Sequence, residues 1–269
     1  MIILFSKNRA IQLDLCLRSM KKYMQDFESA AVIYTTDSYA HAESYDHLKY
    51  EHPEIKFIKE NNNFKKELLD AVETKGEKFV TFIVDDNIFV RNFVLYDGHE
   101  VLTKQKYGLG FSLRLGRNTT MCYPINRAQA LPSFQTMWEN ILTYNWTTAN
   151  YDFGYPLELS SSTYEIKTIM PILEGCEYNS PNTLEAIMDY NKSYFISEKP
   201  LLYCYGQSVA FCNPINKVQV FNNNRCGINE KYTPDSLLKM YEKGKRISLE
   251  QFEDFVPTGA HEEVEIEFV

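Results

Sequence analysis

The stretch Phe79-Val80-Thr81-Phe82-Ile83-Val84 runs directly into Asp85-Asp86-Asn87. A continuous run of β-branched and aromatic residues predicts a strand that is buried on both faces, as in a parallel sheet covered by helices. Two adjacent carboxylates are unfavourable unless a cation offsets their charge, and a divalent metal is the usual partner. An exposed acidic turn is the alternative interpretation of the same residues.

The chain before this stretch alternates between strand and helix patterns. In residues 10–24, Leu13, Leu17, Met20 and Met24 recur at spacings of four, three and four, which predicts an amphipathic helix. Similar patterns predict strands over residues 1–5, 30–35 and 55–58 and helices over 38–51 and 64–72. This alternation is typical of an α/β fold with a parallel sheet, in which ligands bind beyond the carboxyl ends of the strands.

The second half of the chain is less regular. We expect a strand over 107–115 and strand-like pieces over 209–220 and 263–269. We expect helices over 127–143 (interrupted at Pro132), over 165–173, from Pro181, and from Thr233 to Gly244. No linker or repeat separates the halves, so residues 1–269 are predicted to form a single domain with a regular half, 1–115, and an irregular half, 116–269.

Composition excludes several classes of protein. The 269 residues carry 28 Lys and Arg against 36 Asp and Glu, a net charge of −8, which argues against a nucleic-acid partner. Hydrophobic residues make up 44%, a globular balance. The six cysteines form no Cys-x-x-Cys pair, and no secretory signal or apolar stretch of membrane-spanning length is apparent. We therefore expect reduced thiols, no transmembrane segment and a cytoplasmic protein.

Polar groups follow three of the predicted strands, as Lys7-Asn8-Arg9, Thr36-Asp37 and Asp85-Asp86-Asn87. Phosphatases and mutases with an aspartate nucleophile carry their acidic motif on the first strand, where this chain has a basic loop. Nucleotidyltransferases of related fold need a Gly-rich loop there, and the chain has none. A basic loop after the first strand and an acidic motif after the fourth resemble the arrangement in GT-A nucleotide-sugar glycosyltransferases.

Short motifs extend this resemblance along the chain. Phe5–Leu13 looks like the "FSxxRPxQL" opening of a group of bacterial glycosyltransferases, with Ala10 in place of Pro, and Phe82–Phe89 is similar to their "VDDDIF" segment. His261–Glu265 looks like their closing His-x-Glu-Val. Further matches are Phe111–Gly116, Tyr155–Leu157, Pro181–Glu185 and Asn224–Gly227. The resemblance implies a GT-A-like domain in which 1–115 binds the nucleotide sugar and 116–269 binds the acceptor and completes the metal site.

The resemblance also implies roles for particular residues. The expected donor-binding residues are Ser6, Lys7, Arg9, Asp37, Asp85 and Arg114, and the expected ligands of Mn²⁺ or Mg²⁺ are Asp85, Asp86, Asn87 and His261. Each has a structural alternative. Asp37 is equally well explained as a helix N-cap, Arg114 as part of a structural ion pair, and His261 as an ordinary structural histidine.

The chain departs from the family pattern at two places. Asn87 replaces the last Asp of the metal motif, and an amide oxygen binds a hard cation more weakly than a carboxylate does. Residues 158–162, Glu-Leu-Ser-Ser-Ser, stand where relatives carry Asp-Gly-His. Because this stretch is expected to face the acceptor, the choice of acceptor is expected to differ.

An inverting transfer needs a carboxylate that accepts the proton of the acceptor hydroxyl. Asp152 and Glu185 are the two candidates, with equal standing, and a retaining mechanism would need neither. The alternative for Glu185 is a glutamate near a helix start that is capped by Asn182 or Thr183. Four aromatic residues are candidates for a wall against a sugar, or for core residues, namely Trp146, Tyr151, Phe153 and Tyr155.

The sequence therefore predicts a metal-dependent glycosyltransferase of polysaccharide biosynthesis. It would move a sugar from a nucleotide-diphosphate donor, with UDP favoured, to a glycan or lipid-linked glycan, and a peripheral membrane contact is compatible with the latter. A non-catalytic carbohydrate-binding or scaffolding protein with the same fold is the alternative, and a sugar nucleotidyltransferase is a weaker one. The sequence leaves the sugar, the stereochemistry and the oligomeric state open.

Overall fold

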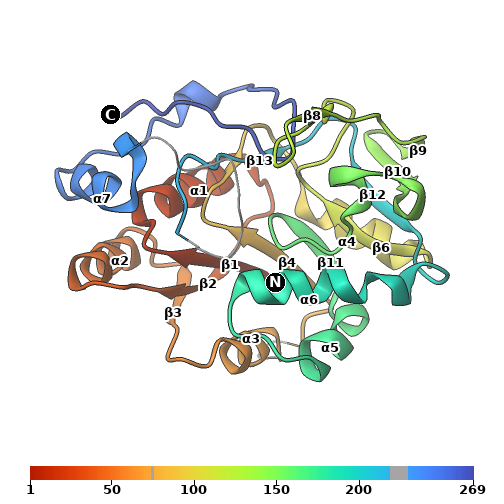
Figure 1. The fold of residues 1–269 in the computed structure, drawn as a ribbon, viewed down its shortest axis with the longest axis horizontal. Helices are drawn as coiled ribbons and strands as arrows, with labels where there is room; N and C mark the ends of the chain where they lie inside the picture. Colours follow the sequence, from red (N-terminus) through yellow and green to blue (C-terminus); the bar gives the residue numbers. More distant parts are fainter. Residues whose placement is uncertain (74–75, 219–229) are drawn as a thin grey trace.

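The computed structural model of the chain describes residues 1–73, 76–218 and 230–269 (Figure 1). A nine-stranded sheet forms its centre. In spatial order the strands are β3 (Ile55–Lys59), β2 (Ala30–Thr35), β1 (Ile2–Lys7), β4 (Phe79–Val84), β11 (Ser162–Glu165), β6 (Gly108–Ser112), β12 (Leu201–Tyr205), β10 (Ile141–Asn145) and β9 (Gln135–Trp138). Only β11 and β10 run against the direction of the others. The predicted α/β class with a mostly parallel, helix-flanked sheet is confirmed.

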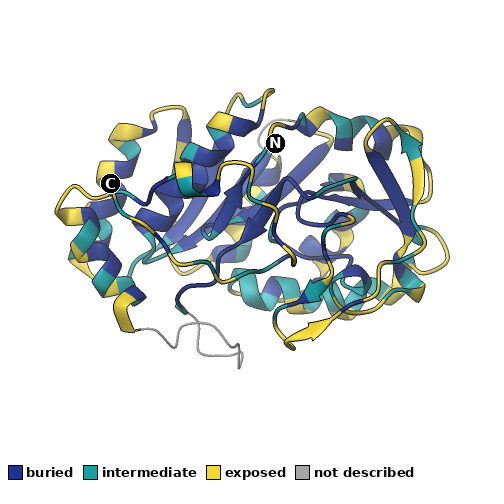
Figure 2. Cartoon of the chain, turned by 90° about the horizontal axis from the view of Figure 1, so that it is seen from above, coloured by how far each residue is buried: buried dark blue, intermediate teal, exposed yellow. Residues whose placement is uncertain are grey.

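Helices cover both faces of the sheet. The helices α1 (Ala10–Tyr23), α2 (Tyr39–Glu51), α4 (Leu95–Lys104) and α7 (Pro234–Glu242) pack into one hydrophobic cluster, and α3 (Phe64–Glu73), α5 (Ile166–Gly175) and α6 (Pro181–Tyr190) pack into a second. Alternate residues of β1 divide between the clusters, with Leu4 in the first and Phe5 in the second. Figure 2 shows buried strands between helices whose outer sides are exposed.

Each strand and helix predicted for the first 90 residues is present in the structure. Phe5 lies opposite Val84 in the parallel pairing of β1 with β4, and Lys7 lies opposite Thr35 in the pairing of β1 with β2. The backbone N–H of Asp85 donates to the carbonyl of Phe5 at 3.1 Å, so the pairing continues to the end of β4. This register places the loops after β1, β2 and β4 at one edge of the sheet.

The helix predicted over 127–143 is wrong. Residues Arg127–Ala128 form β8, which pairs with β7 (Met121–Cys122), and a hairpin of β9 and β10 follows Pro132. The β-forming run Ile141–Tyr144 finds a partner in β12, which is distant in sequence. Tertiary pairing therefore outweighs the local helical pattern.

The strand predicted over 263–269 is also wrong, since this segment is extended but forms no strand. Among the described residues its backbone-to-backbone hydrogen bonds reach only Arg246 and Ser248, and the Gln251 side chain donates to the carbonyl of Glu265 and accepts from the backbone N–H of Glu267. Residue 268 forms a single isolated bridge with Ile247.

The remaining predictions in the second half agree with the structure. The helices α5, α6 and α7 lie where expected, Thr233 caps α7, and the strand predicted over 107–115 is the shorter β6. The strand-like stretch 209–220 contains β13 (Ala210–Cys212), but its last two residues lie outside the described residues. Short 3₁₀ helices occur at Trp146–Thr148, Tyr151–Gly154, Asn191–Phe195, Glu230–Tyr232 and Glu250–Phe252.

Two further observations concern the thiols and the membrane. Of the six cysteines, the five that the structure describes are free, as expected, and Cys226 lies outside the described residues. Within the described ranges, every helix is too short or too polar to cross a membrane.

The strand β5 (Asn87–Phe89), which the sequence pattern does not show, connects the acidic motif to the second half of the chain. It pairs antiparallel with β13, so that Asn87 lies opposite Cys212. Cys212 also forms a parallel bridge with His261. Residues that are far apart in sequence thereby converge beside the carboxyl end of β4.

Candidate active site

A buried polar cluster closes the carboxyl ends of β1 and β4. Asp85 Oδ2 accepts from the Ser6 hydroxyl at 2.8 Å and from the backbone N–H of Lys7 at 3.2 Å. The other oxygen, Oδ1, accepts from Arg9 Nη1 at 2.9 Å. Burial raises the pKa of Asp85, Arg9 acts to lower it, and Asp86 adds to the rise.

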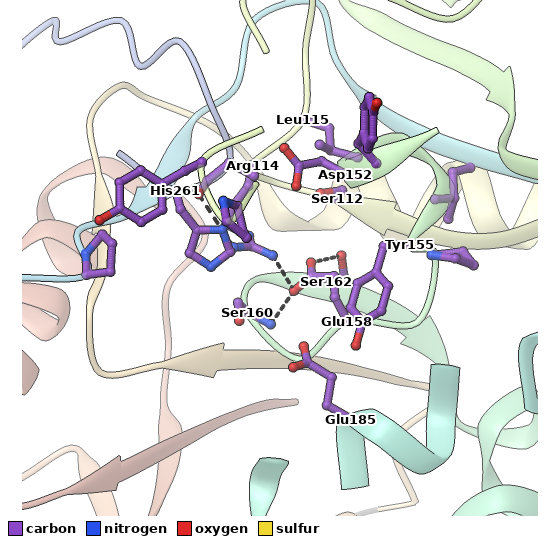
Figure 3. Close-up of a pocket in the computed structure, with 17 residues that line it drawn as sticks. Ser112, Arg114, Leu115, Asp152, Tyr155, Glu158, Ser160, Ser162, Glu185 and His261 are labelled. Carbon is purple, nitrogen blue, oxygen red and sulfur yellow. Dashed lines mark hydrogen bonds and ion pairs between the residues drawn. The ribbon is translucent and has the colours of Figure 1, made fainter. Parts of the chain in front are cut away.

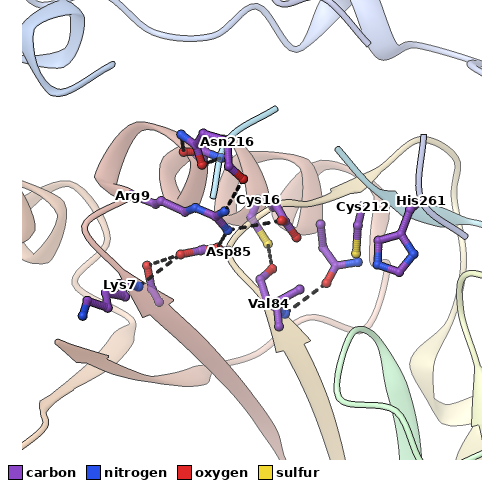
Figure 4. Close-up of polar contacts among 12 residues, drawn as sticks. Lys7, Arg9, Cys16, Val84, Asp85, Cys212, Asn216 and His261 are labelled. Carbon is purple, nitrogen blue, oxygen red and sulfur yellow. Dashed lines mark hydrogen bonds and ion pairs between the residues drawn. The ribbon is translucent and has the colours of Figure 1, made fainter. Parts of the chain in front are cut away.

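Arg9 holds both carboxylates of the acidic motif. Its Nη1 also lies 3.2 Å from Asp86 Oδ2, and its Nη2 donates to the carbonyl of Asn216 at 2.7 Å (Figure 4). The cation that the adjacent aspartates were expected to need is therefore supplied, in this arrangement, by a guanidinium of the chain itself. Arg9 and Asp85 were both predicted as donor-binding residues, and the structure brings them into contact.

Lys7 and Asp37 form an exposed rim beside this cluster. Lys7 Nζ lies 3.1 Å from Asp37 Oδ2, and Asn8 exchanges hydrogen bonds with both the side chain and the backbone of Asp37. Asp37 is not the cap of α2, since Ser38 takes that position and accepts from the N–H of His41. The alternative explanation of Asp37 as an N-cap is therefore excluded.

Asn87 lies behind the acidic pair and is fully buried. Its Oδ1 accepts from the N–H of Val84 at 3.0 Å, and its Nδ2 donates to the carbonyl of Ser160 at 3.4 Å. These contacts bind the turn after β4 to the loop before β11. They use the amide oxygen that a metal ion would otherwise need.

Arg114 and Glu158 form a buried ion pair on the far side of Cys212. Arg114 Nη2 lies 2.8 Å from Glu158 Oε2, which also accepts from the N–H of Ser160, while Oε1 accepts from the Ser162 hydroxyl. Burial acts to lower the pKa of Arg114, but Glu158 overcomes this and the net pKa is raised. The structural alternative for Arg114, an ion pair, is thus present, although Arg114 also lines the cavity described below.

The same arginine determines the state of His261. Arg114 Nη1 donates to His261 Nε2 at 3.2 Å, and because arginine has no acceptor, the proton of a neutral imidazole must lie on Nδ1. Burial and Arg114 lower the pKa of His261 to about 3, so the ring is neutral. Nδ1 is buried with no hydrogen-bond partner among the described residues, as is Arg114 Nε. Both are donors that an anionic oxygen could satisfy.

A cavity of about 350 Å³ brings Arg114 and His261 together with both candidate bases (Figure 3). Its walls come from β6, from the loops around residues 123, 151–162 and 214, and from α6. The lining residues are Ser112, Arg114, Leu115, Tyr123, Pro124, Tyr151, Asp152, Tyr155, Pro156, Glu158, Ser160, Ser162, Glu185, Leu202, Pro214, Ala260 and His261. Of the four aromatic residues proposed as a wall, Tyr151 and Tyr155 line the cavity, whereas Trp146 and Phe153 are buried in the second hydrophobic cluster.

The two candidate bases differ in their contacts. Asp152 Oδ2 accepts from Gln129 at 2.8 Å and Oδ1 accepts from the Cys122 thiol at 3.5 Å. Glu185 Oε1 accepts from the N–H of Leu159 at 3.0 Å, and Oε2 has no hydrogen bond among the described residues. Burial raises the pKa of Glu185 to about 7, which suits a group that gains and loses a proton near neutral pH.

The explanation of Glu185 as part of a helix cap is not supported. Ser180, rather than Asn182 or Thr183, caps α6, and its side chain accepts from the N–H of Thr183. Thr183 completes the reciprocal capping box. Glu185 lies beyond these positions, in the second turn of the helix.

The predicted metal ligands fit an ion only in part. Sites that bind Mg²⁺ together with phosphate need one or two carboxylates. Asp86 is the least engaged of the four predicted ligands, since its contact is to Arg9 through Oδ2. Asp85 would have to leave Arg9, and neither Asn87 Oδ1 nor His261 Nε2 is open in this arrangement. The ligand roles of Asn87 and His261 therefore stay predictions.

A second group of potential ligands, Asp14, Glu51 and His52, lies outside this region. Cations of the chain already neutralise it. Arg18 Nε lies 2.8 Å from Asp14, Arg246 contacts Glu51, and Lys21 Nζ lies 2.6 Å from His52. This group acts as an ion-pair network that joins α1 and α2 to the segment after α7.

Sequence reasoning missed Glu158 as a site residue. The stretch 158–162 stood out because it departs from the family pattern, but it carried no role beyond facing the acceptor. A glutamate that is followed by small hydroxyl residues is a weak signal. Only the contact with Arg114, 44 residues away, identifies it.

Comparison with known proteins finds similarity in sequence to one curated protein and partial similarity in fold to several solved structures. No family model matches the chain. The chain is 30% identical over 191 residues to the bifunctional glycosyltransferase pgtA of Dictyostelium discoideum. The match covers 65% of this chain and 25% of the relative, so the chain spans about a quarter of that protein's length.

Solved glycosyltransferases show a partial likeness in fold. TarS 1–349 of S. aureus has a TM-score of 0.47 at 12% identity, covering 78% of this chain and 59% of that one. The mannosyltransferase PcManGT of Pyrobaculum calidifontis, in complex with GDP-Man and Mn²⁺, has a TM-score of 0.42 at 10% identity, covering 69% and 50%. No property of the present chain follows from likeness at this level. The relation established is sequence similarity to part of a glycosyltransferase, extending over 65% of this chain.

Proposed function

We propose that this chain is a glycosyltransferase that moves a sugar from a nucleotide-diphosphate donor to a hydroxyl group of a glycan or related acceptor. One observation carries the proposal. The polar strand ends of β1 and β4 are joined through Asn87, Cys212 and His261 to a cavity that holds a raised-pKa carboxylate. A donor site and a base are thereby adjacent. The 30% identity to a glycosyltransferase supports the same reaction class.

The donor lies across the carboxyl ends of the strands. Lys7 and Asp37, on the exposed rim, contact the nucleoside, and Ser6, Arg9 and Asp85 form the floor beneath it. The diphosphate reaches Arg114 and His261. Two buried donors there, Arg114 Nε–H and His261 Nδ1–H, have no partner among the described residues. Such donors stabilise the charge that grows on the leaving diphosphate.

Glu185 is the base. The acceptor hydroxyl gives its proton to Glu185 as its oxygen forms a bond to the anomeric carbon, and the bond from that carbon to the diphosphate breaks with its electron pair. Glu185 is preferred to Asp152 because Asp152 accepts a hydrogen bond at each oxygen. A base of this kind belongs to an inverting transfer.

Metal dependence stays a prediction. Asp86, with Asp85 if Arg9 withdraws, would hold Mn²⁺ or Mg²⁺. When bound, the ion would neutralise part of the diphosphate charge. UDP is the favoured nucleotide on the resemblance in sequence.

A second candidate is a non-catalytic carbohydrate-binding protein with the same fold. The closed contact of Arg9 with Asp85 and Asp86 favours it, since this contact leaves the acidic motif satisfied without a ligand. Release of free sugar from a nucleotide sugar would exclude it.

Calorimetry with UDP, GDP and CDP, each with Mn²⁺ and with EDTA, tests the proposal. At least one nucleotide should bind the wild-type chain, and Asp86→Asn should remove any difference between Mn²⁺ and EDTA. Asp46→Asn is the matched control, because Asp46 is exposed and lies on α2. Binding that is equal with EDTA would contradict metal dependence alone. Failure of all three nucleotides to bind under either condition would overturn the proposed function.

Donor hydrolysis tests the base. Glu185→Gln should lower turnover by about 10²–10⁴-fold, while nucleotide affinity should change little. Asp152→Asn provides the comparison, since it removes the rival carboxylate from the same cavity. A larger loss with Asp152→Asn than with Glu185→Gln would reverse the assignment.

A further inference from the structure

The charge of the 350 Å³ cavity is unusual for a site beside a diphosphate. Three carboxylates line it, those of Asp152, Glu158 and Glu185, and Arg114 is the only lysine or arginine among the lining residues. His261 is neutral. Figure 3 shows the Glu158 carboxylate between Asp152 on one side and Glu185 on the other. An anionic group that entered would therefore meet negative charge on both sides.

Arg114 cannot offset a second anion in the cavity. Its Nη2 is engaged by Glu158 at 2.8 Å, and its Nη1 by His261 at 3.2 Å. Nη1 also donates to the Cys212 sulfur, and Nε, the nitrogen with no partner among the described residues, is taken by the diphosphate in the proposed function. A carboxylate on the sugar would thus lack a cation to pair with.

A cationic sugar would find few open acceptor oxygens, because two of the three carboxylates are already engaged by donors of the chain. Glu158 accepts from Arg114, the N–H of Ser160 and the hydroxyl of Ser162. Asp152 accepts from Gln129 and Cys122. Glu185 keeps an oxygen without a hydrogen bond among the described residues, and its contact with the N–H of Leu159 holds the carboxyl in place.

The rest of the lining suits hydroxyl groups and C–H faces. Tyr123, Tyr151 and Tyr155 present aromatic rings, and burial together with Glu185 raises the pKa of Tyr155, which keeps its hydroxyl neutral. Ser112, Ser160 and Ser162 add small polar groups. Flat apolar faces combined with a few placed polar groups are the usual composition of a pocket for a small neutral ligand.

We propose that this cavity takes an uncharged, hydroxyl-rich sugar unit and rejects sugars that carry a carboxylate. The proposal rests on the proposed function, in which this sugar is part of a substrate. It goes further by naming the class of sugar and the residues, Asp152 and Glu185, that impose the selection.

Saturation-transfer NMR on the full chain tests the proposal directly. The probes are glucose, galactose and N-acetylglucosamine, the uronates of glucose and galactose, and the cationic glucosamine, measured at pH 8. Neutral sugars should bind at least tenfold more tightly than the matched uronates, and glucosamine should gain no tenfold advantage over glucose. Glu185→Gln should raise the affinity for uronates at least threefold relative to the neutral sugars.

Two further variants keep the result interpretable. Glu174→Gln makes the same charge change on the exposed side of α5 and should leave the discrimination unchanged. Asp152→Asn should also raise the affinity for uronates relative to neutral sugars. It serves as the test variant if Glu185→Gln does not fold. Uronates that bind as tightly as neutral sugars, glucosamine that binds tenfold more tightly than glucose, or no binding of any sugar would each overturn the proposal.

Nucleotide binding on the same samples separates the two proposals. Sugar discrimination without nucleotide binding would overturn the proposed function and leave the neutral-sugar cavity standing. Nucleotide binding without sugar discrimination would do the reverse.

Discussion

Glu158 and Glu185 line the same cavity, yet their partners give them different properties. Glu158 accepts hydrogen bonds from the buried Arg114 and from two further donors. Glu185 has one backbone N–H and no cation in contact, so burial dominates and its pKa rises to about 7. Asp85 lies between these cases, because Arg9 opposes the effect of burial.

Glu185→Gln should change the pH dependence of stability. The pKa of Glu185 rises from an ordinary 4.5 to about 7 on folding, under burial and the nearby Glu158 and Asp189, against Arg114 and the N–H of Leu159. The folded state therefore binds the proton more tightly, and this stabilisation is present below pH 4.5 and lost as pH rises through 7.

Urea unfolding at pH 5 and pH 8 measures this effect. The wild type should lose stability relative to Glu185→Gln by on the order of 2 kcal/mol between the two pH values. Glu174→Gln should follow the wild type, because Glu174 is exposed. Parallel pH profiles for the wild type and Glu185→Gln would show that the carboxyl is not perturbed.

At the level of elements, α6 illustrates how local chemistry delivers a site residue. Ser180 and Thr183 form a reciprocal capping box, and Pro181 stands at the first helical position. Leu184 and Met188 bury one side of the helix in the second hydrophobic cluster. These features fix where α6 begins and which way it faces, and Glu185 is thereby directed into the cavity.

Ser180→Ala should destabilise the protein by about 1 kcal/mol, since it removes the acceptor for the N–H of Thr183. Thermal unfolding against the wild type measures the loss. Ser197→Ala is the matched control, because Ser197 is exposed and lies outside the helix. An equal shift in both variants would mean that the cap contributes nothing specific.

At the scale of the whole molecule, strands from both halves of the chain share one sheet. The strand β11 lies between β4 and β6, and β12, β10 and β9 extend the sheet beyond β6. The two hydrophobic clusters lie on opposite faces and are joined through the alternate side chains of these strands. Unfolding of either half alone would therefore leave unpaired strand edges in the other half.

We expect a single cooperative unfolding transition for this reason, as the prediction of one domain requires. Far-UV circular dichroism and tryptophan fluorescence should give coincident urea curves. The fluorescence reports on both clusters, since Trp146 is buried in the second and Trp138 packs against the first. Separated transitions would indicate two folding units.

Sequence by itself determined the βα alternation of the first 90 residues and the loops that carry Arg9, Asp85 and Asp86. The strands appear in the sequence as continuous apolar runs and the helices as apolar stripes with a period of about 3.6 residues. A parallel order places the polar carboxyl ends of the strands at one edge of the sheet. The helices α5, α6 and α7 were predictable for the same reason, with Pro as a local start signal and Gly as a local stop signal.

Tertiary structure alone decided the rest. The hairpin of β9 and β10 replaced a predicted helix because β12 offered a partner strand, and residues 263–269 form only one isolated bridge within the described part of the chain, to Ile247. Arg114 meets Glu158 across 44 residues and His261 across 147, and only these contacts set the tautomer of His261 and the role of Glu158. Contacts at such separations leave no periodic trace, because their energy depends on which surfaces the folded chain brings together.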